Sequence, residues 1–583
     1  MTMTPQRIFL CLAAALVVSS APVAAQDASP ALFLRGATII DGVSDTPRVG
    51  SLLIEGNAIR AVLPSAAAAP EGAEVVDLSG KFIVPGLVDS HSHWEDWMGE
   101  LYINQGVTSV VALRNLAASF RAESQTSLGL PRLFHSGNRP PFGEDMTEAE
   151  IRQTVRDWLG NGPDMAHFPT YNESVARSYA IAADEVHKEG FLIFGHAEDA
   201  PAATRAGLDI VEHVWGFAQA AMAPGELRAF QQGEFLTWGT RMTDWNRLED
   251  MIGEAVARGA YLNPTLLYEW GGLSARARER ELEEYWLLAD PGLVYFPREV
   301  AELLLARHRQ IKNFSSRYEN MPRLARLPAA GQAEFRQGFE NVLRFTRAYA
   351  AAGGKIQAGT DVISGGTPGL SLHHEMEMLT EAGLTPMQAL KSATSWSAEI
   401  LAGRNGARGA AKVGSIASGM LADLVVLAAD PLADISNVKR IERVMKNGRW
   451  IALGYHPDYI TLTRPATPPV AATYAPVIAS VTPSSVAAGS PAQRVVLEGS
   501  GFTMGSLVRV DGISVRTDFI NPRRIEFDLP AAVVAEAGPD PYLAQGPAQI
   551  VGVVGYRAVE IEVFNPPPAG GVSNAVYQMV RPR

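Results

Sequence analysis

Between about residues 86 and 405, short apolar runs alternate with longer helical stretches. Residues 107–113, 191–194 and 208–211 have the length and composition of strands, and residues 174–188 carry alanine, valine and isoleucine at helical spacing. This alternation is typical of βα units around a parallel sheet. Its repetition predicts a (β/α)8 TIM barrel within an α/β protein, with functional side chains at the carboxyl ends of the strands.

The segments on either side of this region are patterned as strands. Residues 51–55 and 58–62 predict a hairpin, because Gly56-Asn57 between them is a strong turn pair. Strand and turn patterns return at residues 419–427 and 444–451. Because both flanks adjoin the barrel, we expect residues 31–85 and 406–455 to form one composite β-sandwich domain, with residues 86–405 as the barrel. Residues 268–350 are helical and rich in Arg and Glu, which fits either an insertion over the barrel mouth or ordinary outer helices.

The C-terminal part of the chain differs from the barrel. Residues 456–475 are rich in Pro, Thr and Ala and read as a linker. Residues 476–583 contain strand candidates at 495–502, 507–510 and 559–563, separated by turn residues. This pattern predicts a second, smaller β-sandwich with an immunoglobulin-like fold.

The N-terminus has the features of a secretory signal. Arg7 precedes an apolar run over residues 8–18, and small residues at 23–25 offer a cleavage site. We therefore expect residues 1–25 to be a signal peptide and the chain to be exported, periplasmic or extracellular, with no integral membrane span after cleavage. The only cysteine is Cys11, so any metal in the mature chain must be held by histidine and carboxylate. The net charge of −12 argues against nucleic acid as a partner.

Four histidines and one aspartate each follow a strand-like run. They are His91, His93, His196, His213 and Asp361. On a strand, the spacing of His91 and His93 places both imidazoles on one face, where they would point into the barrel mouth. Neutral imidazoles with a carboxylate suit zinc or a similar divalent ion. Such an ion would activate a water molecule, with Asp361 as the natural proton acceptor; the alternative for Asp361 is a helix N-cap or turn residue.

In this arrangement the chain resembles the metal-dependent amidohydrolase superfamily, and within it the imidazolonepropionase-like and exported Xaa-dipeptidase-like members. The matching motifs lie at residues 85–93, 195–197, 206–213, 263–266, 358–361, 381–390 and 414–424. The resemblance implies a hydrolase of carbon–nitrogen bonds with Asp361 as general base and acid. The C-terminal segment resembles an IPT/TIG domain at residues 478–483, 499–502 and 565–574.

One departure from the family concerns the number of ions. Family members with two metals carry a carboxylated lysine at the end of the fourth strand, and the matching position here is His167. Histidine cannot form a carbamate, although His167 could bind an ion directly or line the pocket. The resemblance then implies one ion rather than two, held by His91, His93, His196 and Asp361. His213 would hold the water or the substrate.

Three functions fit this pattern. The first is an exported hydrolase of an amide, a cyclic amide or a dipeptide; the second is a deaminase of a nitrogen heterocycle; the third is a catalytically inactive surface binding protein. The retained histidines and Asp361 favour the enzymes. Expected partners are a small-molecule substrate, a second copy of the chain and, through the C-terminal domain, a surface or polysaccharide. Candidate substrate contacts are Arg114, Arg139 and Arg241, and Trp238, Trp245 and Trp270 either shape the pocket or pack in the core.

Overall fold

The computed structural model describes most of the chain from residue 30 onward. It describes residues 30–581 except 232–238, 289, 291, 294, 297–328, 363–365, 410, 457–458, 460–475, 503, 505, 512, 536–556 and 566–570. The predicted signal peptide, Trp238, most of the predicted linker and part of the predicted helical insertion therefore lie outside the described residues.

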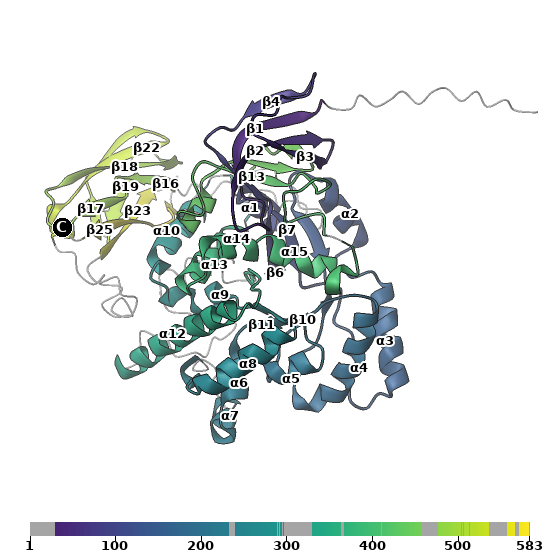
Figure 1. Ribbon diagram of the computed structural model, residues 1–583. Helices are drawn as coiled ribbons and strands as arrows, with labels where there is room; N and C mark the ends of the chain where they lie inside the picture. Colours follow the sequence, from purple (N-terminus) through teal and green to yellow (C-terminus); the bar gives the residue numbers. More distant parts are fainter. Residues whose placement is uncertain are drawn as a thin grey trace, which may run out of the picture.

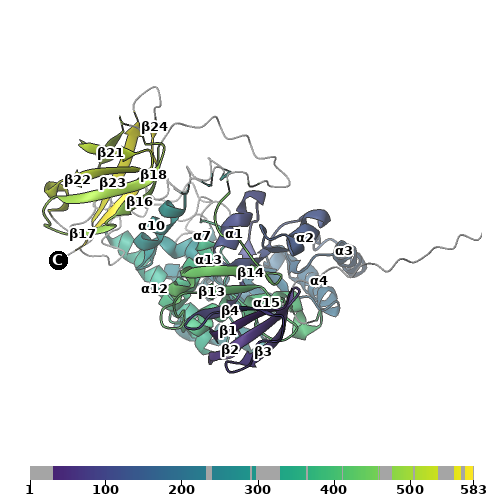
Figure 2. The same cartoon turned by 90° about the horizontal axis from the view of Figure 1, so that it is seen from above.

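Both flanks of the central region contribute to one eight-stranded sheet. Its strand order is β15-β14-β13-β5-β1-β2-β3, and β4 pairs with β1. The bounds are β1 (Leu32–Ile39), β2 (Arg48–Glu55), β3 (Ala58–Pro64), β4 (Glu74–Asp77), β5 (Phe82–Pro85), β13 (Leu424–Leu427), β14 (Ile441–Lys446) and β15 (Arg449–Trp450). Strands β2 and β3 form the hairpin expected around Gly56-Asn57, and β13 runs antiparallel to β5. Figure 2 shows this sheet as a layer against the helical body.

Parallel strands form the centre of the molecule (Figure 1). One set is β6 (Leu87–Ser92), β7 (Val107–Ala112) and β8 (Arg132–His135); the other is β9 (Ala166–His167), β10 (Ile193–Gly195), β11 (Ile210–Glu212) and β12 (Tyr261–Asn263). Every residue of β6, β7, β10 and β11 is buried. Continuous burial of this kind is typical of parallel strands that are covered by helices.

Helices follow most of these strands along the chain. They are α1 (Gly99–Asn104), α2 (Ala118–Thr126), α3 (Glu148–Gly160), α4 (Ala176–Lys188), α5 (Ala200–Arg205), α6 (Trp215–Ala221), α7 (Pro224–Gln231), α8 (Trp245–Ala257), α9 (Leu266–Trp270), α10 (Ala277–Leu288), α12 (Ala329–Ala351), α13 (Leu370–Glu381), α14 (Pro386–Ser392) and α15 (Ser395–Ala402). Local sequence sets several of their starts: Thr147 and Glu150 form a capping box at α3, and Thr385 and Gln388 form one at α14.

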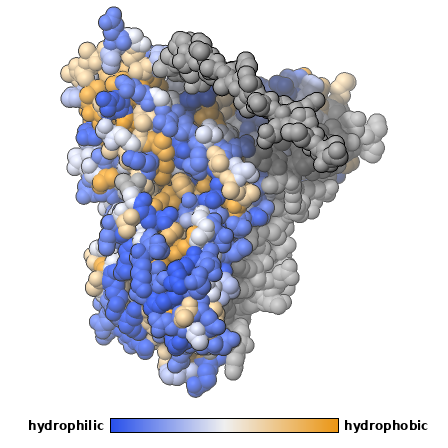
Figure 3. Space-filling model, turned by 90° about the vertical axis from the view of Figure 1, so that its right-hand side faces the viewer, coloured by the Kyte–Doolittle hydropathy of each residue, from blue (hydrophilic) through white to orange (hydrophobic). Residues whose placement is uncertain are grey.

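Two of these helices lie on the hydrophilic face of Figure 3. Helices α3 and α4 pack against each other and carry ion pairs on their outer sides, Arg152 with Asp184 and Arg156 with Glu185. Hydrophilic side chains cover much of the lower part of this face. Inside, Ile151, Val155 and Val186 are fully buried. Amphipathic helices of this type cover a parallel sheet and leave the strand ends open.

The segment that carries Asp361 is held between two strands. The amide of Gln357 donates to the carbonyl of Leu262 at 2.9 Å, beside β12, and the amide of Asp361 donates to the carbonyl of His91 at 2.9 Å, on β6. Residues near both ends of the central region in sequence therefore meet at one place. This pairing brings Asp361 next to the first histidines.

The C-terminal part forms two sheets that share a separate apolar core, set beside α10 (Figure 1). One sheet has the order β16-β18-β22-β21 and the other β17-β25-β23-β19-β20, with β24 beside β23. The bounds are β16 (Val477–Thr482), β17 (Ser485–Ala487), β18 (Gln493–Ser500), β19 (Leu507–Val510), β20 (Ile513–Val515), β21 (Thr517–Asn521), β22 (Arg524–Leu529), β23 (Arg557–Asn565), β24 (Gly571–Val572) and β25 (Val576–Arg581).

In the part of the chain that the structure describes, no helix combines the length and the apolar character that a bilayer crossing requires.

Candidate metal centre

The five predicted ligands lie together at the carboxyl ends of the parallel strands. His91 belongs to β6 and His93 follows it, while His196 and His213 follow β10 and β11. Asp361 Oδ1 lies 2.9 Å from His93 Nε2 and 3.3 Å from His91 Nε2, and Asp361 Oδ2 lies 3.9 Å from His213 Nε2. The strand-end argument thus placed these side chains in one cluster. The side chains of His93 and His196 are 26% and 14% exposed and mark its open side.

A sixth side chain, Glu212, lies at the middle of the cluster and was not predicted as a ligand. Its Oε1 atom is 3.0 Å from His196 Nε2, 3.2 Å from His91 Nε2 and 3.6 Å from His213 Nε2. Glu212 ends β11, and neighbouring residues of a strand normally face opposite sides. His213, however, has φ of 62°, which turns the chain so that both side chains face the cluster.

The spacing of these atoms suits a divalent ion. Two groups, His91–His93–Asp361 and His167–His196–Glu212, each have their ligand atoms within 4.8 Å of one another. Donors at 2.0–2.2 Å from a tetrahedral ion are about 3.3–3.6 Å apart, close to the separations found here. Within the described part of the chain, several buried atoms of the cluster have no hydrogen-bond partner: His91 Nδ1 and Nε2, Glu212 Oε2 and Asp361 Oδ2. Unpartnered buried polar atoms are costly, so the residues present fit a bound metal ion.

Burial and charge shift the pKa values of several residues of the cluster. Burial lowers the pKa of His213 to about 3 and that of His167 to about 4, so both imidazoles are neutral at pH 7. Burial alone would raise the pKa of Glu212, but His196 and His91 hold it well below its ordinary value. Asp361 is likewise held ionised against burial, chiefly by His91. The cluster therefore combines two neutral imidazoles, those of His167 and His213, with two ionised carboxylates, whose charge in turn raises the pKa of His91.

Thr265 fixes the tautomer of His213. The Thr265 hydroxyl donates to the carbonyl of Pro264 at 2.9 Å, so its oxygen accepts the hydrogen bond from His213 Nδ1. The proton of the ring is then on Nδ1, and the lone pair of Nε2 faces Glu212 and Asp361. Metal-binding histidines are commonly oriented by such a contact on the other ring nitrogen.

Backbone strain is concentrated at this site. Six non-glycine residues of the described chain have positive φ, and three of them are His213, Thr265 and Asp361, with φ of 62°, 45° and 48°. A left-handed conformation is costly for threonine and histidine, so it persists only where the surroundings impose it. Such clustering is typical of functional sites.

A layer of buried polar residues lies behind the ligands. Asp89 accepts hydrogen bonds from the Thr360 hydroxyl at 2.6 Å and from the amide of His91 at 3.2 Å. The backbone carbonyl of Asn263 accepts a hydrogen bond from the amide of His213, and its side-chain Nδ2 donates one to Ser90 Oγ. These contacts connect β6, β12 and the Asp361 segment, and they hold the ligand-bearing backbone in place.

His167 and Arg139 lie at one edge of the cluster. Arg139 Nη2 is 2.9 Å from His167 Nε2, and that nitrogen is 3.7 Å from Glu212 Oε2. The guanidinium therefore faces the same nitrogen that would bind an ion. Of the other candidate arginines, Arg114 donates to the carbonyl of Trp94 and pairs with Glu95.

Two aromatic residues that the sequence analysis did not single out, Trp215 and Tyr268, lie beside the site. Trp215 stacks on His196 with ring centroids 5.7 Å apart, and Tyr268 stacks on His213 at 6.5 Å. Trp245 instead lies under the Arg344 guanidinium, and Trp270 stacks on Phe339. Trp215 could have been found from its position two residues after His213.

The remaining described histidines make contacts outside the cluster. His135 contacts the backbone of Leu116 and Gly162, His373 the carbonyl of Gln105, His374 the carboxylate of Glu283 and His456 that of Glu100. None of these contacts involves a residue of the cluster.

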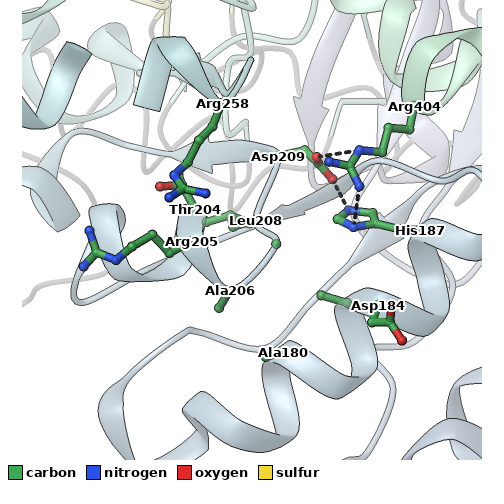
Figure 4. Close-up of a pocket in the computed structure, with 12 residues that line it drawn as sticks. Ala180, Asp184, His187, Thr204, Arg205, Ala206, Leu208, Asp209, Arg258 and Arg404 are labelled. Carbon is green, nitrogen blue, oxygen red and sulfur yellow. Dashed lines mark hydrogen bonds and ion pairs between the residues drawn. The ribbon is translucent and has the colours of Figure 1, made fainter. Parts of the chain in front are cut away.

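His187 belongs to a separate pocket of about 460 Å³ (Figure 4). There it contacts Asp209 Oδ2 at 2.7 Å and Arg404 Nη1 at 3.0 Å. Asp209 directly precedes β11, whereas the candidate ligands follow the strands, so this pocket lies at the opposite strand ends.

Comparison with known proteins finds a family match over part of the chain. Residues 179–451, just under half of the chain, match the Amidohydrolase family. This match includes His196, Glu212, His213 and Asp361, whereas His91, His93 and His167 precede it.

Curated relatives cover shorter parts of the chain. An N-acyl-D-aspartate deacylase of Alcaligenes xylosoxydans xylosoxydans is 32% identical over 138 residues, which are 22% of this chain and 24% of that protein. A dihydroorotase of Geobacter metallireducens is 35% identical over 187 residues, 29% of this chain and 43% of the dihydroorotase. The matches therefore span less than half of either relative.

Solved structures of similar proteins cover most of the chain at low identity. A putative prolidase from Bifidobacterium longum is 21% identical with a TM-score of 0.49, over 74% of this chain and 97% of that structure. A Xaa-Pro dipeptidase with methionine in its active site is 20% identical with a TM-score of 0.48, over 73% of this chain and all of the other.

Proposed function

We propose that this protein is a metal-dependent hydrolase that cleaves a carbon–nitrogen bond in an amide, a cyclic amide or a dipeptide. The observation that carries the proposal is the buried cluster of histidines and carboxylates, several of whose atoms have no hydrogen-bond partner. Most of this cluster lies within the residues that match the Amidohydrolase family. Two curated relatives are named for N-acyl-D-aspartate deacylation and for dihydroorotase activity, both of which concern C–N bonds.

Each ligand has a role in this proposal. His91, His93 and Asp361 would hold a divalent ion such as zinc, with His196, Glu212 and His213 on the other side of the cluster and His167 at its edge. When bound, the ion lowers the pKa of water toward 7 and polarises the scissile carbonyl. Asp361 Oδ2, which has no hydrogen-bond partner, is the atom that accepts a proton from water.

Hydrolysis forms one bond to the carbonyl carbon and breaks another. The oxygen of water bonds to the carbonyl carbon, the C–N bond breaks, and the proton taken by Asp361 passes to the leaving nitrogen. His213, whose Nδ1 proton is engaged by Thr265, presents its unprotonated Nε2 to the same space, where it accepts a hydrogen bond from water and orients it. The rings of Trp215 and Tyr268 beside His196 and His213 provide apolar walls near the substrate.

We extend the proposal to the rest of the chain. We infer that the parallel strands belong to a (β/α)8 barrel, that residues 1–25 direct export, and that the C-terminal sheets form an IPT/TIG-like module. Such modules usually bind a partner or hold neighbouring domains apart, and the first of these roles suits contact with a surface or polysaccharide.

A substrate screen tests the proposed activity. The zinc-loaded protein is incubated with N-acyl amino acids, dipeptides and lactams, and released amine is measured, with Asp361→Asn as the control. We expect turnover of at least one class by the native chain and none by the variant. A protein with full metal content that hydrolyses none of these classes would instead support the inactive binding protein.

A further inference from the structure

The missing lysine leaves one question about the cluster, namely which group could join two ions. His167 stands at the position that resembles the bridging lysine, and this substitution favoured a single ion. Glu212 changes that expectation, because it is a buried carboxylate between the two groups of ligands. Its side chain is 2% exposed.

Glu212 Oε1 lies between the two ligand groups, and Oε2 lies beside the second. Oε1 lies 3.2 Å from His91 Nε2 in the first group and 3.0 Å from His196 Nε2 in the second. Oε2 lies 3.7 Å from His167 Nε2 and has no hydrogen-bond partner. An ionised carboxylate with an unpartnered, fully buried oxygen is expensive without a cation beside it.

Charge and chemistry agree with this placement. A glutamate carboxylate and a lysine carbamate are both monoanions that offer two oxygens on one carbon atom. Replacing one with the other keeps the negative charge of the cluster while changing the strand that supplies it. The φ of 62° at His213 is the local feature that lets β11 supply Glu212 and His213 to the same space.

We propose that Glu212 bridges two divalent ions, one held with His91, His93 and Asp361 and the other with His196, His213 and His167. This inference rests on the proposed metal-dependent function and deepens it. For His167 to bind the second ion, its Nε2 must give up its contact with Arg139. The competing arrangement keeps Arg139 on His167, so that the guanidinium takes the place of the second cation.

Metal counting on the purified full chain distinguishes these arrangements. The protein is stripped with chelator, reloaded with Mn²⁺ and analysed by elemental analysis and electron paramagnetic resonance. We expect two ions per chain in the native protein with an exchange-coupled Mn spectrum. Glu212→Gln should hold at most one ion and give the spectrum of isolated Mn²⁺.

A matched control variant is Glu377→Gln. Residues Glu377 and Glu212 are both 2% exposed, but Glu377 pairs with Arg280 and Lys439 instead of histidines. We expect this control to keep two coupled ions, so that loss in Glu212→Gln is not the general result of removing a buried charge. Reloading in CO2-free buffer should leave the native count unchanged, because no carbamate is required.

Several results would overturn the proposal. They are a native count of one ion, two coupled ions in Glu212→Gln, or a native count that depends on CO2. The native count and spectrum decide the matter even if Glu212→Gln does not fold. A one-ion protein that hydrolyses the amide panel would refute the bridge and leave the proposed function intact. A two-ion protein without turnover would support the bridge and refute the proposed function.

Discussion

Replacing Thr265 with valine should weaken metal binding although Thr265 is not itself a ligand. Valine keeps the β-branched shape at this left-handed position, so the backbone strain is similar, but it removes the oxygen that accepts from His213 Nδ1. Both residues are buried, at 0% and 3% exposure. The Nδ1–H group then loses its partner at a cost of about 1–3 kcal/mol.

The imidazole also loses the contact that fixes its tautomer, and a proton on Nε2 would block ligation. Outer contacts of this kind are worth about 10- to 100-fold in metal affinity, or about 1.4–2.7 kcal/mol. The dissociation constant, measured by competition of stripped protein with a chromophoric chelator, should rise by that factor. Thr265→Ser retains the hydroxyl and should bind nearly as the native chain does. Equal affinity of Thr265→Val and the native chain would refute the role given to Thr265 and the tautomer assigned to His213.

Three further changes have defined outcomes. Asp361→Asn should retain bound metal but abolish turnover, because the amide oxygen can still ligate while no carboxylate accepts the proton; normal turnover would remove Asp361 from the mechanism. Burial raises the pKa of Glu375 from 4.5 to about 7, so the native state binds more protons than the unfolded state in that range. The stability that Glu375 contributes is therefore fully present below pH 4.5 and lost as the pH rises through about 7, by about 3 kcal/mol in total. In urea unfolding, Glu375→Gln should lack this decline, and parallel pH profiles of variant and native protein would show the assignment to be mistaken. His213→Ala should reduce turnover more than it reduces metal content, since His213 also orients water. Elemental analysis and the rate of turnover are measured on the same sample, and equal fractional losses of the two would mean that His213 acts only as a ligand.

The sequence was informative where function depends on strand ends. His91, His93, His196, His213 and Asp361 each follow an apolar run, and parallel strands bring their carboxyl ends together. The hairpin at Gly56-Asn57 was likewise readable, because that dipeptide favours a tight turn. Periodicity and turn chemistry are local properties, so one sequence is enough to reveal them.

The sequence was less informative where function depends on an unusual backbone. Strand alternation would turn Glu212 away from the face of His213, and only the left-handed φ at His213 reverses this. Histidine adopts that conformation far less often than glycine does, so the residue type alone does not predict it. The pairing of Thr265 with His213 and the contact of Arg139 with His167 depend on tertiary packing of segments distant in the sequence, which no single motif encodes.

The central claim is that this cluster holds a metal on which C–N hydrolysis depends. The most direct measurement is the rate of amine release from the most active substrate of the panel, taken before chelation, after chelation and after return of zinc, with metal content measured on the same samples. We predict that the rate falls to background when the metal is removed and recovers in proportion to the zinc bound. A rate that is unchanged in metal-free protein would contradict the account.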